Sequence, residues 1–280
     1  MLIFSKIFAI TNNVAKYFKL AVGCCFWRRV VVVANIDVQV ISLRNSTERR
    51  LAISKSLECF PIPWKFFDAC SGTSNVGLDY NQENATNWFG RALSNNEVGC
   101  FKSHYTVINN FLVNREFDWL IVFEDDLIVD PLFDYLSLVK YMKTNDIRYM
   151  RLHCRRWKSA RVVGYFMHRQ ILCFRTDPFG TQSYILNKDA ASAILSGISD
   201  IRRPIDDEFG RFWKHGVDII GLFPFPVLET STASILEESR AALSSKAPAK
   251  FSQRATRMLL RGFDKIGKIY ANVSRDLSKC

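Results

Sequence analysis

The most informative pattern of apolar and polar positions lies at residues 119–126, where five large apolar residues run directly into Glu124, Asp125 and Asp126. A run of this length predicts a strand that is buried on both faces. Carboxylates follow such a strand only where its carboxyl end is exposed, and ligands of open α/β sheets bind at that end. Because side chains alternate along a strand, we expect Glu124 and Asp126 on one face and Asp125 on the other.

The rest of the pattern predicts one mixed α/β body. The predicted elements are strands at 38–43, 64–67, 119–123 and 183–186, helices at 48–57, about 94–114, 131–141 and 188–195, and a long polar loop at 71–92. Ser94 and Glu97 form a capping-box pattern at the start of the second helix. Asn187 is expected to cap the last helix, and Asn45 or Ser46 the first. The first strand, helix and strand have the spacing of a βαβ unit with a parallel pair.

Charge separates the body from the two ends of the chain. The formal net charge is +11, of which residues 1–33 carry +5 and residues 246–280 carry +7, leaving −1 for residues 34–245. A near-neutral body argues against nucleic acid as a partner and for an anionic membrane surface. We therefore expect an apolar and basic N-terminal segment at 1–33, a folded body at 34–245 and a membrane-associating tail at 246–280.

The tail has the clearer pattern of the two ends. Its basic residues Arg254, Arg257, Arg261, Lys265 and Lys268 recur at spacings of three and four, beside an apolar arc. This pattern predicts a basic amphipathic helix that lies in a membrane interface. A surface helix that packs its apolar stripe on the body is the alternative.

The N-terminal segment is apolar but interrupted. Its longest clean apolar run, residues 20–27, is too short to span a bilayer, and no cleavable signal pattern is present. The segment is either a membrane anchor or part of the fold. The eight cysteines show no ligand-like spacing, so we expect reduced thiols in a cytoplasmic protein.

The acidic strand end predicts a cation site. Three adjacent carboxylates repel one another unless a cation neutralises them, and oxygen ligands suit Mg²⁺ or Mn²⁺. The alternative is an acidic turn that closes a strand. A second acidic cluster, with Asp206 and Asp207 after Pro204, lies later in the chain.

Several blocks in order resemble glycosyltransferase family 25, the lipooligosaccharide and lipopolysaccharide sugar transferases of Gram-negative bacteria. The blocks are residues 40–43 with Arg49 and Arg50, residues 67–69 with Asp68, residues 97–105, 122–126, 180–186 and 204–207, and a closing Ser234, Ile235 and Arg240. The resemblance covers about residues 38–240. It implies a GT-A-like, Rossmann-type mixed sheet flanked by helices.

The resemblance also implies an inverting transferase at the cytoplasmic face of the inner membrane. Its donor would be a nucleotide sugar, UDP-galactose or UDP-glucose, and its acceptor a sugar hydroxyl of a glycolipid. Gln182 and the acidic run at 207–209 depart from the family pattern and leave donor and acceptor open. The sequence does not predict the oligomeric state. A non-catalytic, membrane-peripheral binding module is the rival hypothesis.

The chemistry assigns roles to the acidic and basic residues. Asp126, assisted by Glu124 or Asp125, would hold a metal that stabilises the leaving diphosphate. Arg49 or Arg50 would add positive charge there, unless they form a solvated helix face.

A general base must also take the acceptor proton, and Asp206 or Asp207 is the candidate, with helix capping as the alternative. His104, beside Ser103, is either a buried hydrogen-bonded residue or a site residue that contacts nucleotide or sugar or exchanges protons. With Asp68, these residues complete the predicted site.

Overall fold

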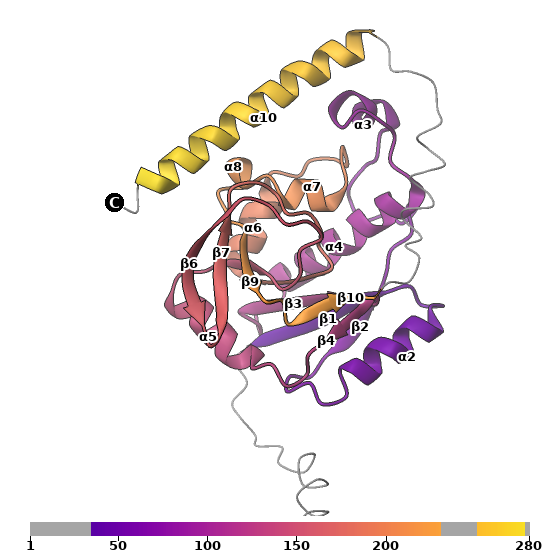
Figure 1. The fold of residues 1–280 in the computed structure, drawn as a ribbon. Helices are drawn as coiled ribbons and strands as arrows, with labels where there is room; N and C mark the ends of the chain where they lie inside the picture. The colour runs from indigo at the N-terminus through magenta and orange to yellow at the C-terminus, as the bar shows by residue number, and fades with distance from the viewer. Residues whose placement is uncertain (1–34, 231–250, 278–280) are drawn as a thin grey trace, which may run out of the picture. The chain divides into compact units, whose positions relative to one another are not determined.

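The computed structural model describes residues 35–230 and 251–277 of a chain that divides into two units, Met1–Val33 and Ala34–Cys280. The predicted N-terminal segment therefore lies outside the described residues. An eight-stranded sheet has the order β2-β1-β3-β8-β5-β9-β7-β6, and β4 and β10 form a separate antiparallel pair (Figure 1). The strands are β1 (Ile36–Ser42), β2 (Lys65–Asp68), β3 (Trp119–Glu124), β4 (Leu127–Val129), β5 (Tyr149–Arg151), β6 (Ala160–Phe166), β7 (Arg169–Phe174), β8 (Ser183–Asn187), β9 (Ile220–Phe223) and β10 (Val227–Glu229).

Helices flank this sheet, so the α/β class with a mixed sheet is confirmed. They are α2 (Thr47–Ser56), α3 (Gln82–Trp88), α4 (Asn95–Val113), α5 (Tyr135–Thr144), α6 (Lys188–Ser196), α7 (Ile205–Phe209), α8 (Phe212–His215) and α10 (Phe251–Leu277).

The predicted βαβ unit is present and sets the edge where ligands bind. β1 pairs in parallel with β2 on one side and with β3 on the other. Because crossovers between parallel strands are right-handed, α2 and α4 lie on opposite faces of the sheet (Figure 1). The carboxyl ends of the three parallel strands therefore meet at one edge.

The strand β3 is buried on both faces, as its apolar run predicts. On one face Leu120 and Val122 belong to the core cluster that includes residues of α4 and α6. On the other face the Phe123 ring lies 5.7 Å from the Phe60 ring, which lies 4.8 Å from the ring of Tyr135. Burial of side chains of this size stabilises the strand by about 1.5–3 kcal/mol each.

Two of the three predicted helix caps are confirmed. The capping box is confirmed, since the Glu97 backbone N–H donates to the Ser94 hydroxyl and the Ser94 N–H to the Glu97 carboxylate. Asn187 caps α6 by accepting from the Ala190 N–H. The predicted cap of α2 is wrong in its chemistry, because Ser46 occupies the N-cap position without a side-chain hydrogen bond.

Other element predictions need correction. The long loop at 71–92 contains a short helix, α3, capped by the Asn81 side chain. The helix predicted at 131–141 begins only at Tyr135, where Asp134 caps it. Strands β4–β7, β9 and β10 were not predicted. Three of them have only three residues, too few to show a period.

The tail forms the predicted helix. The alternative prediction, that this helix packs its apolar stripe on the body, is wrong. α10 lies against α3 and α8, and its large apolar side chains, such as Phe263 and Tyr270, are 71% and 75% exposed. The basic residues Arg257 and Lys268 instead contact the body. Among the residues described, none of the helices is long and apolar enough to cross a membrane.

Candidate functional site

A pocket gathers residues from both acidic clusters. Glu124 and Asp126 line it from the end of β3, and Asp206 lines it from the first turn of α7. Gln182, just before β8, and Arg155, in the loop after β5, add further polar groups to a lining that also includes Glu97, Cys100 and Thr181. The sequence separates these groups by up to 82 positions, and the fold brings them to one place at the carboxyl end of β3.

Asp126 has the environment of a cation ligand. Its Oδ1 is buried and has no hydrogen-bond partner in the described part of the chain. Burial, reinforced by the charge of Glu124, raises the pKa of Asp126 from 3.8 to about 7. A bound divalent cation would satisfy this oxygen and remove the repulsion, so the carboxylate oxygens fit Mg²⁺ or Mn²⁺.

His104 orients Glu124 rather than standing free. Its Nε2 lies 3.2 Å from Glu124 Oε1, and its Nδ1 lies 3.0 Å from the Tyr184 hydroxyl. A carboxylate only accepts, so Nε2 carries the hydrogen and donates it. The buried His104 ring is thus held between Glu124 on β3 and Tyr184 on β8.

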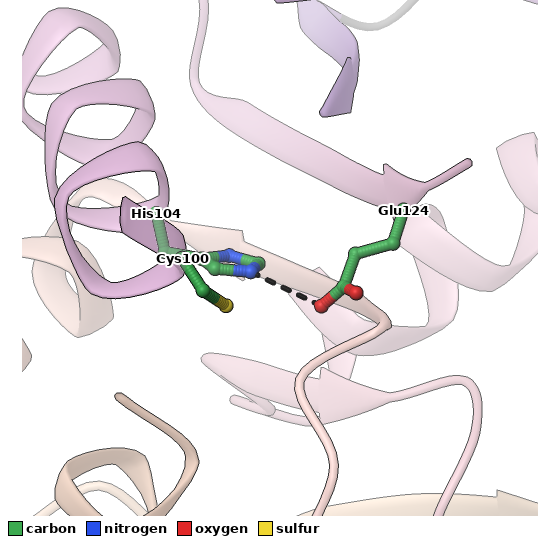
Figure 2. A group of neighbouring side chains, drawn as sticks. All are labelled: Cys100, His104 and Glu124. Atoms are coloured by element: carbon green, nitrogen blue, oxygen red, sulfur yellow. Dashed lines mark hydrogen bonds and ion pairs between the residues drawn. The ribbon is translucent and has the colours of Figure 1, made fainter. Parts of the chain in front are cut away.

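Cys100 brings a second donor set next to the first. Cys100 and His104 are one turn apart on α4 and point toward Glu124 at the end of β3 (Figure 2). The potential ligand atoms of the three residues lie within 4.8 Å of one another. Sulfur and imidazole nitrogen suit softer ions such as Zn²⁺, whereas the oxygen set of Glu124 and Asp126 suits Mg²⁺ or Mn²⁺. Glu124 belongs to both sets.

Asp125 is absent from the pocket that Glu124 and Asp126 line, which agrees with the expected separation, although Asp125 and Asp126 lie in the turn after β3 and not in the strand. Its Oδ2 accepts from the Ser42 hydroxyl at 2.6 Å, and its Oδ1 accepts from Arg49 Nη1 at 3.2 Å. These contacts tie the end of β3 to the end of β1. Asp125 and Arg49, both predicted site residues, therefore pair with each other.

Arg50 and Asp68 form a neighbouring pair at the same sheet edge. Arg50 Nη2 donates to Asp68 Oδ1 at 2.5 Å and to the Ser42 carbonyl at 3.0 Å. The hydrogen bond from Arg50 lowers the pKa of Asp68. The two arginines are thus neither a free helix face nor part of the pocket lining. They surround the carboxyl ends of β1 and β2.

The structure separates the remaining predicted residues. Asp206 lines the pocket, whereas Asp207 accepts a hydrogen bond from Arg203 Nη1 at 2.9 Å and is absent from the lining. The Ser103 hydroxyl is fully buried, donating to the Gly99 carbonyl and accepting from the Cys70 N–H. Ser103 therefore joins α4 to the chain after β2.

Sequence reasoning missed Arg155 and the role of the 180–182 turn. Arg155 Nη2 lies 2.6 Å from Glu229 Oε1, and it brings positive charge to the pocket wall. Gly180 has a φ of +89°, and a Cβ there would lie 2.4 Å from Gln182 Oε1, so the turn requires glycine. The Gly180-Thr181-Gln182 block was the only available signal, because Arg155 follows a strand that was not predicted.

A carboxylate-lined pocket at the strand ends of a mixed α/β sheet is typical of the ligand-binding sites of α/β enzymes. The model of glycosyltransferase family 25, described as an LPS biosynthesis protein, matches residues 35–209, more than half of the chain. The chain therefore belongs to glycosyltransferase family 25, as the resemblance predicts.

Individual proteins that are similar to this chain also belong to glycosyltransferase family 25 or to lipooligosaccharide biosynthesis by their names. The lipooligosaccharide biosynthesis protein lex-1 of Haemophilus influenzae is 27% identical over 202 residues, which cover 59% of this chain and 65% of that protein. The human inactive glycosyltransferase 25 family member 3 is 35% identical over 104 residues, covering 35% of this chain and 17% of that protein. The chain thus spans less than two thirds of the length of these relatives.

One solved structure in the comparison is a Drosophila β1,4-galactosyltransferase 7 in complex with manganese, UDP-Gal and xylobiose. It is 10% identical, covers 80% of each chain and has a TM-score of 0.38.

Proposed function

We propose that this protein is a metal-dependent, inverting glycosyltransferase. It moves a hexose, galactose or glucose, from a UDP-linked sugar to a sugar hydroxyl of a lipooligosaccharide or lipopolysaccharide acceptor. The observation that carries the proposal is the buried Oδ1 of Asp126, which has no hydrogen-bond partner among the described residues, in a side chain that lines the pocket with Glu124 and Asp206. Family membership supports the reaction class, and the names of the Haemophilus influenzae relatives support the acceptor class.

Asp126 and Glu124 would hold the metal, with Mn²⁺ or Mg²⁺ supplying Lewis-acid stabilisation of the departing diphosphate when bound. His104 keeps the Glu124 carboxylate in place through its Nε2–H. Arg155, which pairs with Glu229 at the pocket wall, would supply positive charge to the leaving diphosphate. Arg49 and Arg50 are proposed to contact the nucleotide at the ends of β1 and β2.

Asp206 is the preferred general base. Inversion by a single displacement requires a carboxylate to take the acceptor hydroxyl proton as the bond to the anomeric carbon forms. Asp206 lines the pocket with Glu124 and Asp126, whereas Asp207 is absent from the lining. This position in the pocket supports Asp206 over Asp207 as the proposed base.

We further propose that the protein works on an anionic membrane surface, at the cytoplasmic face of the inner membrane. The positive charge of the chain ends supports this location, because the body between them is close to neutral. A glycolipid acceptor in that membrane would then lie next to the active site.

The test is transfer from a panel of nucleotide sugars with Mn²⁺, Mg²⁺ or excess chelator, scored for donor hydrolysis and for product on purified lipooligosaccharide. We expect activity with one UDP-hexose, lost in chelator and in Asp126→Asn. Asp118→Asn is the matched control, because it alters an exposed carboxylate before the amino end of the same strand. Full activity in chelator would contradict the metal role.

The rival function is a non-catalytic, membrane-peripheral binding module. A relative named inactive belongs to the same family, which keeps this rival in view. It predicts no turnover with any donor and unchanged partner binding in Asp126→Asn, so the same assay separates the two.

A further inference from the structure

The helix α10 is attached to the body by its polar side. Asp264 Oδ1 lies 2.5 Å from Arg211 Nη2, and Asp276 Oδ2 lies 2.9 Å from Arg175 Nη2. Arg275 adds a third ion pair of the opposite sense, with its Nη2 2.5 Å from an oxygen of Asp218. These pairs involve both acidic residues of the described helix.

Close packing supports the ion pairs along the helix. Gly267 lies against the Trp213 ring, where a Cβ would be only 2.7 Å from Cδ1. Lys268 Nζ lies 4.7 Å from the centroid of the same ring, a cation–π distance. Toward the amino end of the helix, Arg257 donates to the Gly90 carbonyl at 3.2 Å. The helix is therefore held over most of its described length.

The side of α10 that faces away from these contacts is apolar. Leu259, Phe263, Ile266, Tyr270, Val273 and Leu277 follow one another at spacings of three or four, which places them in one stripe, here called the outer face. Each of them is at least half exposed, although large apolar side chains are usually buried. A contiguous exposed stripe of this kind marks an interaction surface.

The charge around the outer face indicates its partner. Both acids of the described helix are drawn to the body, whereas Arg261 and Lys265 are exposed. The outward half is therefore an apolar ridge without a carboxylate, and the exposed basic side chains Arg261 and Lys265 lie behind it, on the polar side of the helix. That combination fits the boundary of an anionic membrane, where apolar side chains enter below the headgroups and basic side chains meet phosphates.

We infer that the outer face of α10 inserts into an anionic lipid surface while the opposite side holds the body in a fixed orientation. The anchor is next to the pocket, because Asp264 also lies 3.7 Å from Arg203, whose neighbour Pro204 precedes Asp206 in the pocket wall. Membrane attachment thus sets where the pocket opens relative to the lipid. This inference rests on the proposed function, because a fixed orientation is useful only if the acceptor lies in the membrane. Lipid binding itself can be measured without turnover.

The test uses full-length protein and co-sedimentation with vesicles of phosphatidylethanolamine and phosphatidylglycerol, or of phosphatidylcholine alone. Phe263→Gln with Ile266→Gln removes two outer-face side chains without changing the charge. The matched control is Leu51→Gln with Val113→Gln, which alters two similarly exposed apolar side chains on α2 and α4. Substitution is preferred to deletion, because removing the helix would also uncover Trp213.

We expect the outer-face variant to bind anionic vesicles about tenfold more weakly or worse, and the control to bind like wild type. Arg261→Gln with Lys265→Gln should weaken binding to anionic vesicles only, and less at high salt. Equal binding of the outer-face variant and wild type would overturn the inference. A second result would also overturn it: light scattering shows that the wild type is a dimer, and the outer-face variant is a monomer with unchanged vesicle binding. The outer face would then join two copies of the chain.

Transfer to a soluble acceptor is measured on the same variants. Lost vesicle binding with retained transfer supports the inference. Absence of transfer in wild type, with vesicle binding intact, would contradict the proposed function and leave the lipid surface standing.

Discussion

Replacing Asp126 by Asn should stabilise the metal-free protein at high pH. Burial and Glu124 raise the pKa of Asp126 from 3.8 to about 7 in the folded protein. A raised pKa means that folding favours the protonated form, so this stability is present at low pH and is lost as pH rises from about 4 through 7. At 1.36 kcal/mol per pKa unit, the ionised carboxylate costs about 4 kcal/mol at pH 8. The amide of Asn carries no charge and avoids that cost.

The assay is urea unfolding of wild type and Asp126→Asn in excess chelator at several pH values. The free energy of unfolding of the variant should exceed that of wild type by an amount that grows by about 3 kcal/mol between pH 5 and pH 8. Comparing the two proteins at each pH cancels the titration of groups that do not interact with Asp126. Asp118→Asn serves as the control and should show no such growth.

Metal should remove most of the difference in stability between the two proteins at pH 8. At a free Mn²⁺ concentration about 100 times its dissociation constant, binding adds about 2.7 kcal/mol to wild type, and the variant should gain little. A variant that is less stable than wild type in chelator at pH 8 would refute the reasoning. Equal stabilisation of both proteins by Mn²⁺ would show that the ion binds elsewhere.

Two further predictions concern the pocket and the core. Asp206→Asn should lower kcat by about 10²-fold or more with little change in donor affinity, whereas Asp207→Asn should keep most of its turnover, because Asp207 pairs with Arg203 outside the lining. Steady-state kinetics decides this, and a larger kcat loss in Asp207→Asn would reverse the assignment. Arg151→Met should cost about 3–5 kcal/mol of unfolding free energy, because Arg151 is fully buried and its Nη1 lies 3.0 Å from the buried Asp177, which would lose its cation. Adding Asp177→Asn should recover part of that loss in urea unfolding, and no recovery would argue against the pair.

Some features of this protein were predictable because they depend on neighbours in sequence. The apolar run before Glu124 predicts β3, and the spacing of Ser94 and Glu97 predicts the start of α4. The tail helix follows from a period of three to four residues. Each of these signals is contained within a few turns or one strand, where local geometry decides.

The site needed the tertiary structure because its contacts join distant positions. His104 and Tyr184 are 80 residues apart, and their hydrogen bond depends on β8 pairing antiparallel with β3. Arg155 reaches the pocket only because the three-residue strand β5 lies between β8 and β9, and so short a strand leaves no periodic signal. The choice between Asp206 and Asp207 likewise depends on the position of Arg203.

The tail shows the same division most clearly. The sequence by itself determined that α10 is a helix with an apolar arc and a basic arc, because that follows from residue spacing alone. It left open which arc faces the body. The tertiary structure decided this through Arg211, Arg175 and Trp213, which supply partners for the polar side and leave the apolar side outward. Periodicity fixes the faces of a helix, but only the charges and rings of the surface it meets determine which face is turned inward.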